Sequence, residues 1–329
     1  MARLRRADSS RPGIRRVRRG RGFSYIAPDR TPVRDRATLE RIQALVIPPA
    51  WEDVWICPDE RGHLQAVGVD TKGRRQYRYH DEWRKRRDVE KFDHMLEFGR
   101  ALPKIRHFCA EHLAEEGLTR NRVLACAVRL LDLGFFRIGG EGYAAENETY
   151  GLATMGKRHA KVVGDVVTFD YVAKGGKRRL QCVVDADVAE VVAMLKARRG
   201  GSPELLAWKQ GTRWVDVRSA DINAYIKEFG GGDFTAKDFR TWNATVLAAT
   251  ALSVSAEALG GVTSRKRALV RCFQEVSHYL GNTPAVCRSS YVDPRVIDRF
   301  RGGATILAAL GDPDQRDVIE QAVLGLLDE

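Results

Sequence analysis

The chain has 329 residues, of which 44% are hydrophobic and 30% charged, a composition typical of globular proteins and a length that favours two domains. The formal net charge is +12, which favours a polyanionic partner and, because the surplus is rich in arginine, nucleic acid in particular. No run of about 18 apolar residues is present, which argues against a membrane-spanning helix. The basic N-terminus has no apolar segment behind it, so it does not resemble a secretory signal.

The six cysteines are scattered along the chain without a CxxC pair. This spacing fits neither a disulfide framework nor a zinc ribbon and indicates a reducing cytoplasm. His107 and His112 are five residues apart, which does not place them on one helical face. The sequence therefore predicts no metal site.

Residues 1–22 consist mainly of Arg, Gly and Ser. This composition predicts a disordered basic arm that adds electrostatic affinity for DNA or, equally well, a solubilising tail. Residues 23–88 are expected to form a small β-rich domain, in which short strands separated by Pro, Gly and Asp turns surround one helix. The expected strands are 23–26, 54–56, 63–67 and 75–79, and the expected helix is 36–45.

Basic and aromatic residues alternate in the last of these strands. Period-two geometry places Gln76 on one face and Tyr77 and Tyr79 on the other. A face of Arg and Tyr can bind phosphate while the rings rest on sugar. The alternative is that the two tyrosines pack inward.

The highly charged residues 81–91 are expected to form a linker, and residues 89–329 a mainly helical catalytic domain. Apolar residues recur there with helical spacing, but around residue 159 the period changes to two. Gly-containing turns join the segments of this β region, which predicts a three-stranded antiparallel sheet. The fold class is therefore α+β. The expected helices are 92–116, 119–136, 188–198, 220–229, 237–251, 265–279 and 315–327, and the expected strands are 160–163, 166–172 and 179–184.

The residues available for chemistry favour covalent catalysis of phosphodiester cleavage. The chain lacks an acidic cluster that would hold two Mg²⁺ ions, but it is rich in Arg, Lys and Tyr. Arg137 ends an apolar helix beside glycines, and Lys174 lies in a hairpin turn. Lys237 and Arg240 share one face of a helix that starts after Thr235.

Several segments in order resemble the type IB DNA topoisomerases of the poxvirus and bacterial branch. The catalytic part contains FFRIGGEGY (135–143), AKGGK (173–177), FTAKDFRTW (234–242) and LGNTPAVCRSSYVDP (280–294). The N-terminal part contains IPPAWEDVWICPD (47–59) and GRRQYRYH (73–80). The resemblance extends from about residue 23 to residue 300, and its strength lies in the order and spacing of the motifs together.

The resemblance implies a catalytic set. Tyr291 would be the nucleophile that forms a 3′-phosphotyrosyl bond, and Arg137 and Arg240 would bind the non-bridging oxygens. Lys174 would be the general acid for the 5′ oxygen. Asn282 stands where most members of the family have His; an amide can donate a hydrogen bond but cannot carry a proton, so a modest effect on rate is expected.

The resemblance also implies contacts with double-stranded DNA by Gln76, Tyr77, Tyr79, Tyr143 and Lys237. A single copy would close around the duplex as a two-part clamp, in the cytoplasm and associated with the nucleoid. No ATP, metal or other cofactor is expected, because the covalent bond conserves the energy of the phosphodiester.

Two alternatives remain. A tyrosine recombinase uses the same chemistry, but it usually carries His-x-x-Arg where this chain has Lys237 and Arg240. A non-catalytic, basic DNA-binding protein would explain the charge equally well, although it gives no reason to keep the whole set of Arg, Lys and Tyr.

Overall fold

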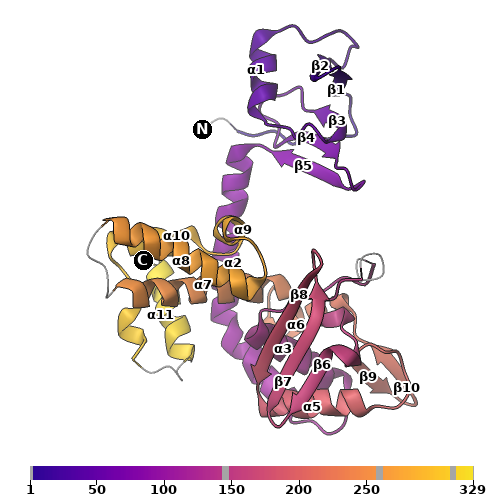
Figure 1. Ribbon diagram of the computed structural model, residues 1–329, viewed down its shortest axis with the longest axis vertical. Helices are drawn as coiled ribbons and strands as arrows, with labels where there is room; N and C mark the ends of the chain where they lie inside the picture. The colour runs from indigo at the N-terminus through magenta and orange to yellow at the C-terminus, as the bar shows by residue number, and fades with distance from the viewer. Residues whose placement is uncertain (1–2, 143–147, 257–261, 312–315, 329) are drawn as a thin grey trace. The chain divides into compact units, whose positions relative to one another are not determined.

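The computed structural model describes residues 3–142, 148–256, 262–311 and 316–328 (Figure 1). The chain divides into two compact units, Met1–Phe92 and Asp93–Glu329, whereas the sequence suggested a division after residue 88. The first unit is built around a β-sheet, and the second is mainly helical with a three-stranded antiparallel sheet. The α+β class is confirmed.

The N-terminal unit has a five-stranded sheet in the order β2-β1-β3-β4-β5, with every neighbouring pair antiparallel. Helix α1 (Arg36–Ala44) begins at Asp35, whose carboxylate accepts the Thr38 N–H as an N-cap. Ile42 on this helix packs into a core formed with sheet residues such as Ile56. The strands are β1 (Ile14–Arg19), β2 (Gly22–Ile26), β3 (Glu52–Ile56), β4 (Leu64–Val69) and β5 (Arg75–Tyr79).

Strand β1 corrects the expectation that residues 1–22 are a disordered arm. It lies inside the sheet, between β2 and β3, and Ile14 at its start is 4% exposed. The chain before it is also held, because the Arg5 carbonyl accepts the His63 N–H at 2.8 Å. The composition of β1 does not predict a strand, because four of its six residues are arginines, most of them exposed. Ile14 and Val17 are its only apolar residues.

The expected linker at residues 81–91 is helical. It forms the first turns of α2 (Asp81–Leu113), which continues through Pro103. Glu, Lys and Arg are good helix formers, and charged pairs one turn apart support this segment, among them Arg87–Glu90 at 2.8 Å. High charge here reflects a solvated helix surface.

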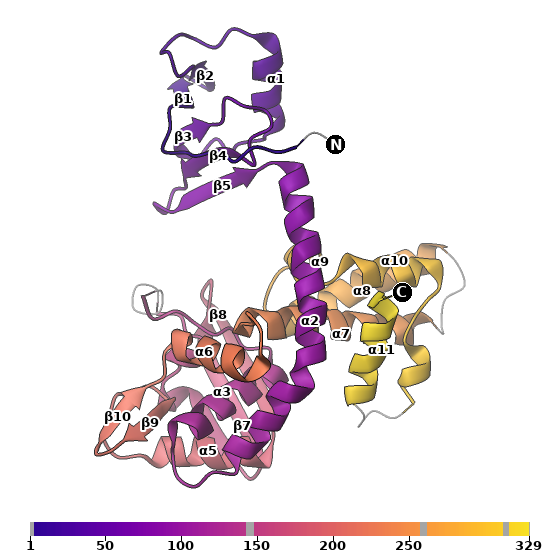
Figure 2. The same ribbon diagram turned by 180° about the vertical axis from the view of Figure 1, so that it is seen from behind.

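In the catalytic unit, helices cover one face of the three-stranded sheet, as the opposite views of Figures 1 and 2 show for α3 and α5. The sheet consists of β6 (Ala160–Val163), β7 (Val166–Ala173) and β8 (Lys177–Val184), and a two-stranded sheet of β9 (Ala207–Gln210) and β10 (Arg213–Asp216) was not expected. The helices after α2 are α3 (Arg120–Gly134), α5 (Ala186–Ala197), α6 (Ser219–Gly230), α7 (Ala236–Ala256), α8 (Val262–Leu280), α9 (Pro284–Ser290), α10 (Pro294–Gly302) and α11 (Arg316–Asp328). The 3₁₀ turns are η1 (Leu152–Thr154), η2 (Lys157–His159) and η3 (Leu307–Ala309).

Strands β7 and β8 form a long hairpin that pairs from Val166↔Val184 to Ala173↔Lys177. Its two faces differ. Gln181 and Val183 are buried toward the helices, whereas Leu180 is 68% exposed on the open face. Cys182 also lies on the open face and is exposed, while the other five cysteines are buried and all six are free thiols.

The C-terminal helix α11 is joined to α2 and α3 by a buried ion-pair network. Arg106 of α2 donates to Asp132 of α3 at 2.9 Å and to Glu320 of α11 at 2.8 Å. Arg316 of α11 also binds Asp132, at 2.7 Å. Burial alone would raise the pKa of Asp132, but the surrounding arginines lower it. Among the described residues, no helix is long and apolar enough to cross a membrane.

Candidate active site

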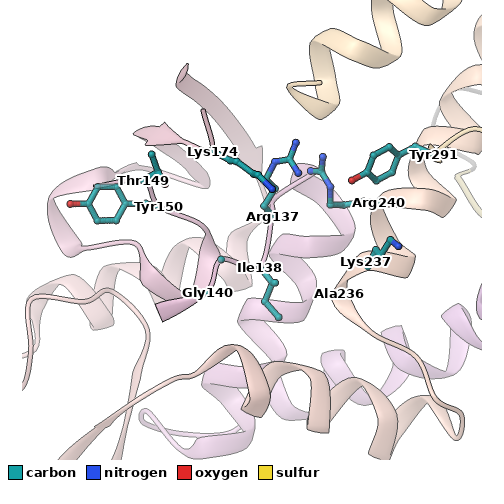
Figure 3. A pocket seen from close by; sticks show the side chains of 11 residues that line it. Arg137, Ile138, Gly140, Thr149, Tyr150, Lys174, Ala236, Lys237, Arg240 and Tyr291 are labelled. Carbon is teal, nitrogen blue, oxygen red and sulfur yellow. The ribbon is translucent and has the colours of Figure 1, made fainter. Parts of the chain in front are cut away.

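Four of the five expected catalytic side chains line one cavity of about 280 Å³ in the catalytic unit (Figure 3). Arg137, Lys174, Arg240 and Tyr291 lie at its wall together with Lys237. They come from four separate segments of the chain, which the fold brings together. The remaining lining residues are Ile138, Gly139, Gly140, Thr149, Tyr150 and Ala236.

Arg137 is positioned by the chain reversal at the end of α3. Phe135 is in the left-handed conformation (φ 55°), and the following Phe136 is fully buried. The next turn approaches the 149–152 segment closely: a Cβ on Gly151 would lie 2.4 Å from the Gly139 Cα. Only glycine permits this approach, which fixes the backbone on both sides of the Arg137 side chain.

Arg240 lies in the second turn of α7 and is 4% exposed. Its guanidinium donates to the Phe135 carbonyl and, at 2.8 Å, to the Leu280 carbonyl, so that it joins the ends of α3 and α8. Burial, and then the charge of Arg137, lower the pKa of Arg240 to about 10. The side chain therefore stays cationic at neutral pH and places a fixed positive charge in the cavity wall.

Tyr291 lies in the break between α9 and α10. Its N–H donates to the Cys287 carbonyl at 3.0 Å, and its own carbonyl accepts the Thr245 hydroxyl at 3.2 Å. The Arg240 Cζ is 5.5 Å from the centre of the phenol ring, and Figure 3 shows the hydroxyl directed toward the guanidiniums. Burial alone would raise the pKa of Tyr291, but the charges of Arg240 and Arg137 outweigh it and lower the pKa.

Asn282 joins this group through Arg137, whose guanidinium donates to the Asn282 Oδ1. The Nδ2 of the same amide is buried without a partner among the described residues, as are the Nε of Arg240 and the Oγ1 of Thr149. Unpartnered polar atoms are costly in a protein interior. Two of these atoms belong to residues that line the cavity, and the third belongs to Asn282, which is held by the cavity residue Arg137. Together they indicate a polar ligand that accepts hydrogen bonds.

Lys174 and Lys237 complete the positive charge of the cavity. Lys174 lies at the tip of the β7–β8 hairpin, followed by Gly175 and Gly176 in the left-handed region (φ 84° and 73°). Lys237 lies in the first turn of α7, one turn before Arg240. A phosphodiester carries negative charge on its non-bridging oxygens, and this arrangement suits it.

The expected DNA-contact residues of the N-terminal unit lie on β5. Tyr77 and Tyr79 are 47% and 36% exposed, and their rings lie nearly parallel with centroids 6.2 Å apart. The inward-packed alternative is therefore wrong. Gln76 donates to Asp70 at 2.9 Å. Tyr143 lies outside the described residues.

Thr149 and Tyr150 line the cavity but were not predicted. No spacing or motif near them indicates a site. They reach the cavity because Gly139 and Gly151 let two segments approach closely, and two glycines about twelve residues apart give no local signal of such a contact.

The chain is similar in sequence to known DNA topoisomerases. Residues 80–302 match the family "Eukaryotic DNA topoisomerase I, catalytic core", and residues 22–70 match "Bacterial DNA topoisomerase IB, N-terminal domain". DNA topoisomerase 1B of Acanthamoeba polyphaga mimivirus is 30% identical over 285 residues, which cover 85% of each chain. DNA topoisomerase 1B of Vaccinia virus (strain Copenhagen) is 23% identical over 271 residues, covering 81% of this chain and 83% of the viral one. The chain belongs to the type IB DNA topoisomerase family.

Proposed function

We propose that this enzyme nicks one strand of duplex DNA through a 3′-phosphotyrosyl intermediate, allows the duplex to rotate, and religates the strand without ATP or a metal ion. The observation that carries the proposal is the position of the Tyr291 hydroxyl, which faces Arg137 and Arg240 across a cavity that Lys174 also lines. A nucleophile, two donors for the phosphate oxygens and an acid thus share one site.

In the proposed cleavage step, the Tyr291 oxygen attacks phosphorus and the bond from phosphorus to the 5′ oxygen breaks. The phenol releases its proton to water, and the 5′ oxygen takes a proton from Lys174. A free phenol has a pKa of about 10 and is a weak nucleophile at neutral pH. The lowered pKa of Tyr291 supports the proposal, because the same guanidiniums that lower it also favour phenolate in the transition state.

Arg137, Arg240 and Asn282 would bind the non-bridging oxygens. The guanidiniums supply charge that is already in place before the reaction, which is the main requirement for stabilising a phosphoryl transition state. Asn282 supports this scheme through its Nδ2, which has no partner in the described part of the chain and can donate to an oxygen while Arg137 holds the Oδ1. Its role is that of a neutral donor.

Religation is the reverse of cleavage: the 5′ hydroxyl attacks the phosphotyrosine, and Lys174 takes the proton back. Because one phosphodiester replaces another, the step requires no ATP. One copy would act on each duplex, with contacts from Gln76, Tyr77 and Tyr79 in the first unit and Lys237 in the second. We place the enzyme at the nucleoid in the cytoplasm, where free cysteines stay reduced.

The test is relaxation of a supercoiled plasmid in EDTA without ATP. We expect the wild-type enzyme to remove supercoils and Tyr291→Phe to be inactive. When reactions on labelled DNA are stopped with SDS, the wild type should leave a protein–DNA adduct and Tyr291→Phe none. Because this substitution removes one oxygen and no charge, equal DNA affinity of the two proteins provides the control.

Four outcomes would contradict the proposal. Relaxation by Tyr291→Phe would show that Tyr291 is not the nucleophile. A requirement for a metal ion would exclude the metal-free mechanism. Strand exchange only between defined sites would identify a recombinase. Binding without an adduct in either protein would identify a non-catalytic DNA-binding protein.

A further inference from the structure

Arg179 connects the hairpin that carries Lys174 to the end of α8. From β8, its guanidinium donates to the His278 carbonyl at 2.7 Å and to the Tyr279 carbonyl at 2.5 Å. These two hydrogen bonds, called here the Arg179 latch, join residues about one hundred positions apart in the sequence. Neither the helical periodicity of α8 nor the strand pattern of β8 predicts them.

The acceptors of the latch are among the last carbonyls of α8, and that of His278 also accepts the Gly281 N–H at 3.3 Å. The last carbonyls of a helix have no intrahelical N–H partner and carry the negative end of the helix dipole, so a cation suits them. In α8 the next carbonyl, that of Leu280, accepts from Arg240. Two arginines from different elements therefore bind three successive carbonyls, which only Gly281 separates from Asn282.

Glycine at position 281 makes room for the latch. A Cβ built on Gly281 would lie 3.2 Å from a terminal nitrogen of Arg179 and 3.3 Å from its Cζ, and φ is +64°. The guanidinium thus lies against the bare backbone of the turn that leads from α8 to Asn282. Hairpin and turn are therefore in direct contact.

A second anchor holds the same hairpin to the other side of the site. The Gln181 amide, two residues along β8, accepts the Tyr171 hydroxyl at 2.6 Å and donates to the Gly134 carbonyl at the end of α3. Gln181 is buried, whereas Arg179 is half-buried at the edge. The inner anchor fixes the base of the hairpin, and the latch lies two residues nearer its tip.

We propose that Arg179 is a positioning residue: it holds the β7–β8 hairpin, and Lys174 at its tip, in register with Asn282 and Arg240 across the cavity. The inference rests on the proposed function, in which Lys174 donates the proton to the 5′ oxygen. Without the latch, the hairpin tip keeps its fold but loses its fixed distance from the phosphate. Proton delivery to the leaving oxygen is then impaired. The phosphate oxygens are still bound, and the nucleophile is still in place.

The experiment compares single-turnover cleavage of two DNA substrates that differ in one atom. One has the natural 5′-bridging oxygen at the cleavage site, and the other has sulfur there. A thiolate leaves without a proton, so the sulfur substrate needs no general acid. We expect Arg179→Ala to cleave the oxygen substrate about 10- to 100-fold more slowly than wild type and the sulfur substrate at close to the wild-type rate. Arg179→Lys, which keeps the charge but loses the planar fork, should show the same pattern with a smaller loss.

Arg178→Ala is the matched control. Arg178 is the adjacent arginine on the same strand, but it lies on the open face and binds the exposed Asp170 at 2.7 Å. Its removal takes away the same charge and should leave the ratio of the two cleavage rates unchanged. Lys174→Ala is the reference for complete loss of the acid and should show the largest selective rescue by sulfur.

The outcomes separate the two claims. If sulfur rescues Lys174→Ala but not Arg179→Ala, the positioning role of Arg179 is overturned and the role of Lys174 as the acid stands. The positioning role is also overturned by an Arg179→Ala enzyme that cleaves both substrates at the wild-type rate or slows on both equally. If sulfur does not rescue Lys174→Ala, the assignment of Lys174 as the acid is wrong, and the inference falls with it. Should Arg179→Ala fail to fold, Arg179→Lys carries the same comparison.

Discussion

At the scale of single residues, Asn282 shows how a neutral side chain can serve a cationic site. An amide has one acceptor and one donor group in a fixed geometry. Arg137 occupies the acceptor, which leaves the buried Nδ2 as a directed donor. A histidine at this position could supply charge as well, whereas here the charge comes from the arginines and Lys174.

Removing this donor should slow the chemical step. We expect Asn282→Ala to reduce the single-turnover cleavage rate about 10²-fold, the usual loss when one donor to a developing oxyanion is removed, with little change in DNA affinity. Asn282→Asp keeps the shape but replaces the donor with a negative charge, so its loss should be larger. Cleavage by Asn282→Ala at the wild-type rate would show that the amide does not reach the phosphate.

The lowered pKa of Tyr291 leads to a prediction about pH. A positive neighbour favours phenolate, so the phenol loses its proton at a lower pH than a free tyrosine, whose pKa is about 10. The difference in phenolate absorbance between the wild type and Tyr291→Phe should therefore titrate below that value. In Arg240→Ala the Tyr291 pKa should rise, because burial remains while one of the two guanidiniums is lost.

One control applies to this titration. Arg288→Ala removes an exposed arginine from α9, three residues before Tyr291, and its difference titration should match that of the wild type. If the Tyr291 pKa is the same in Arg240→Ala as in the enzyme with Arg240, the proposed activation of the phenol is contradicted.

Sequence reasoning identified Arg137, Lys174, Arg240 and Tyr291 as one set, and the structure brings them to one cavity. The set could be proposed from the sequence because each of its members stands in a distinctive local segment. Arg179 was not identified, because its partners are backbone carbonyls, and a carbonyl leaves no trace in the residue type. Thr149 was not identified for a similar reason, since the close backbone contact of Gly139 with Gly151 places it and neither residue type signals that contact.

At the scale of elements, β1 shows where composition misleads. Four of its six residues are arginines, three of them exposed, and yet this charged segment forms an internal strand between β2 and β3. A pattern with two apolar residues in six is too weak to separate such a strand from a disordered arm. The partner strands β2 and β3, which supply its hydrogen bonds, decide the structure.

This strand should be essential for the stability of the N-terminal unit. We expect Ile14→Ala to reduce the free energy of unfolding of that unit by about 2–5 kcal/mol, the range for truncating a buried aliphatic side chain. Urea unfolding followed by tryptophan fluorescence would measure it, because Trp51 and Trp55 lie in this unit. Arg18→Ala, exposed on the same strand, should change little, and an equally small effect of Ile14→Ala would mean that β1 is not part of the folded sheet.

The same reasoning changes what a truncation would report. Deleting residues 1–22 removes β1 and so damages the sheet, and any loss of DNA affinity would mix unfolding with lost charge. Deleting residues 1–4 leaves the Arg5 contact with His63 in place. That shorter deletion is the one that isolates the contribution of terminal charge.

At the scale of the whole molecule, the net charge of +12 means that the release of counterions from the DNA contributes strongly to the affinity for DNA. We expect affinity for a duplex without a preferred site to fall about 10³- to 10⁵-fold as salt rises from about 50 to 200 mM, the behaviour of proteins with about six to ten phosphate contacts. Fluorescence anisotropy at several salt concentrations would measure the slope. Tyr291→Phe should give the same slope, since it removes no charge, and affinity independent of salt would contradict a phosphate-bound interface.

The cysteine distribution makes the enzyme suitable for single-site labelling. With the other thiols buried, Cys182 is the exposed one among the six, and a maleimide dye should attach there without any substitution of the native cysteines. The label would sit on β8, three residues from Arg179 and on the open face of the hairpin. Its polarisation decay would report nanosecond motion of the strand that carries the latch, in the unmodified sequence and in each Arg179 variant alike.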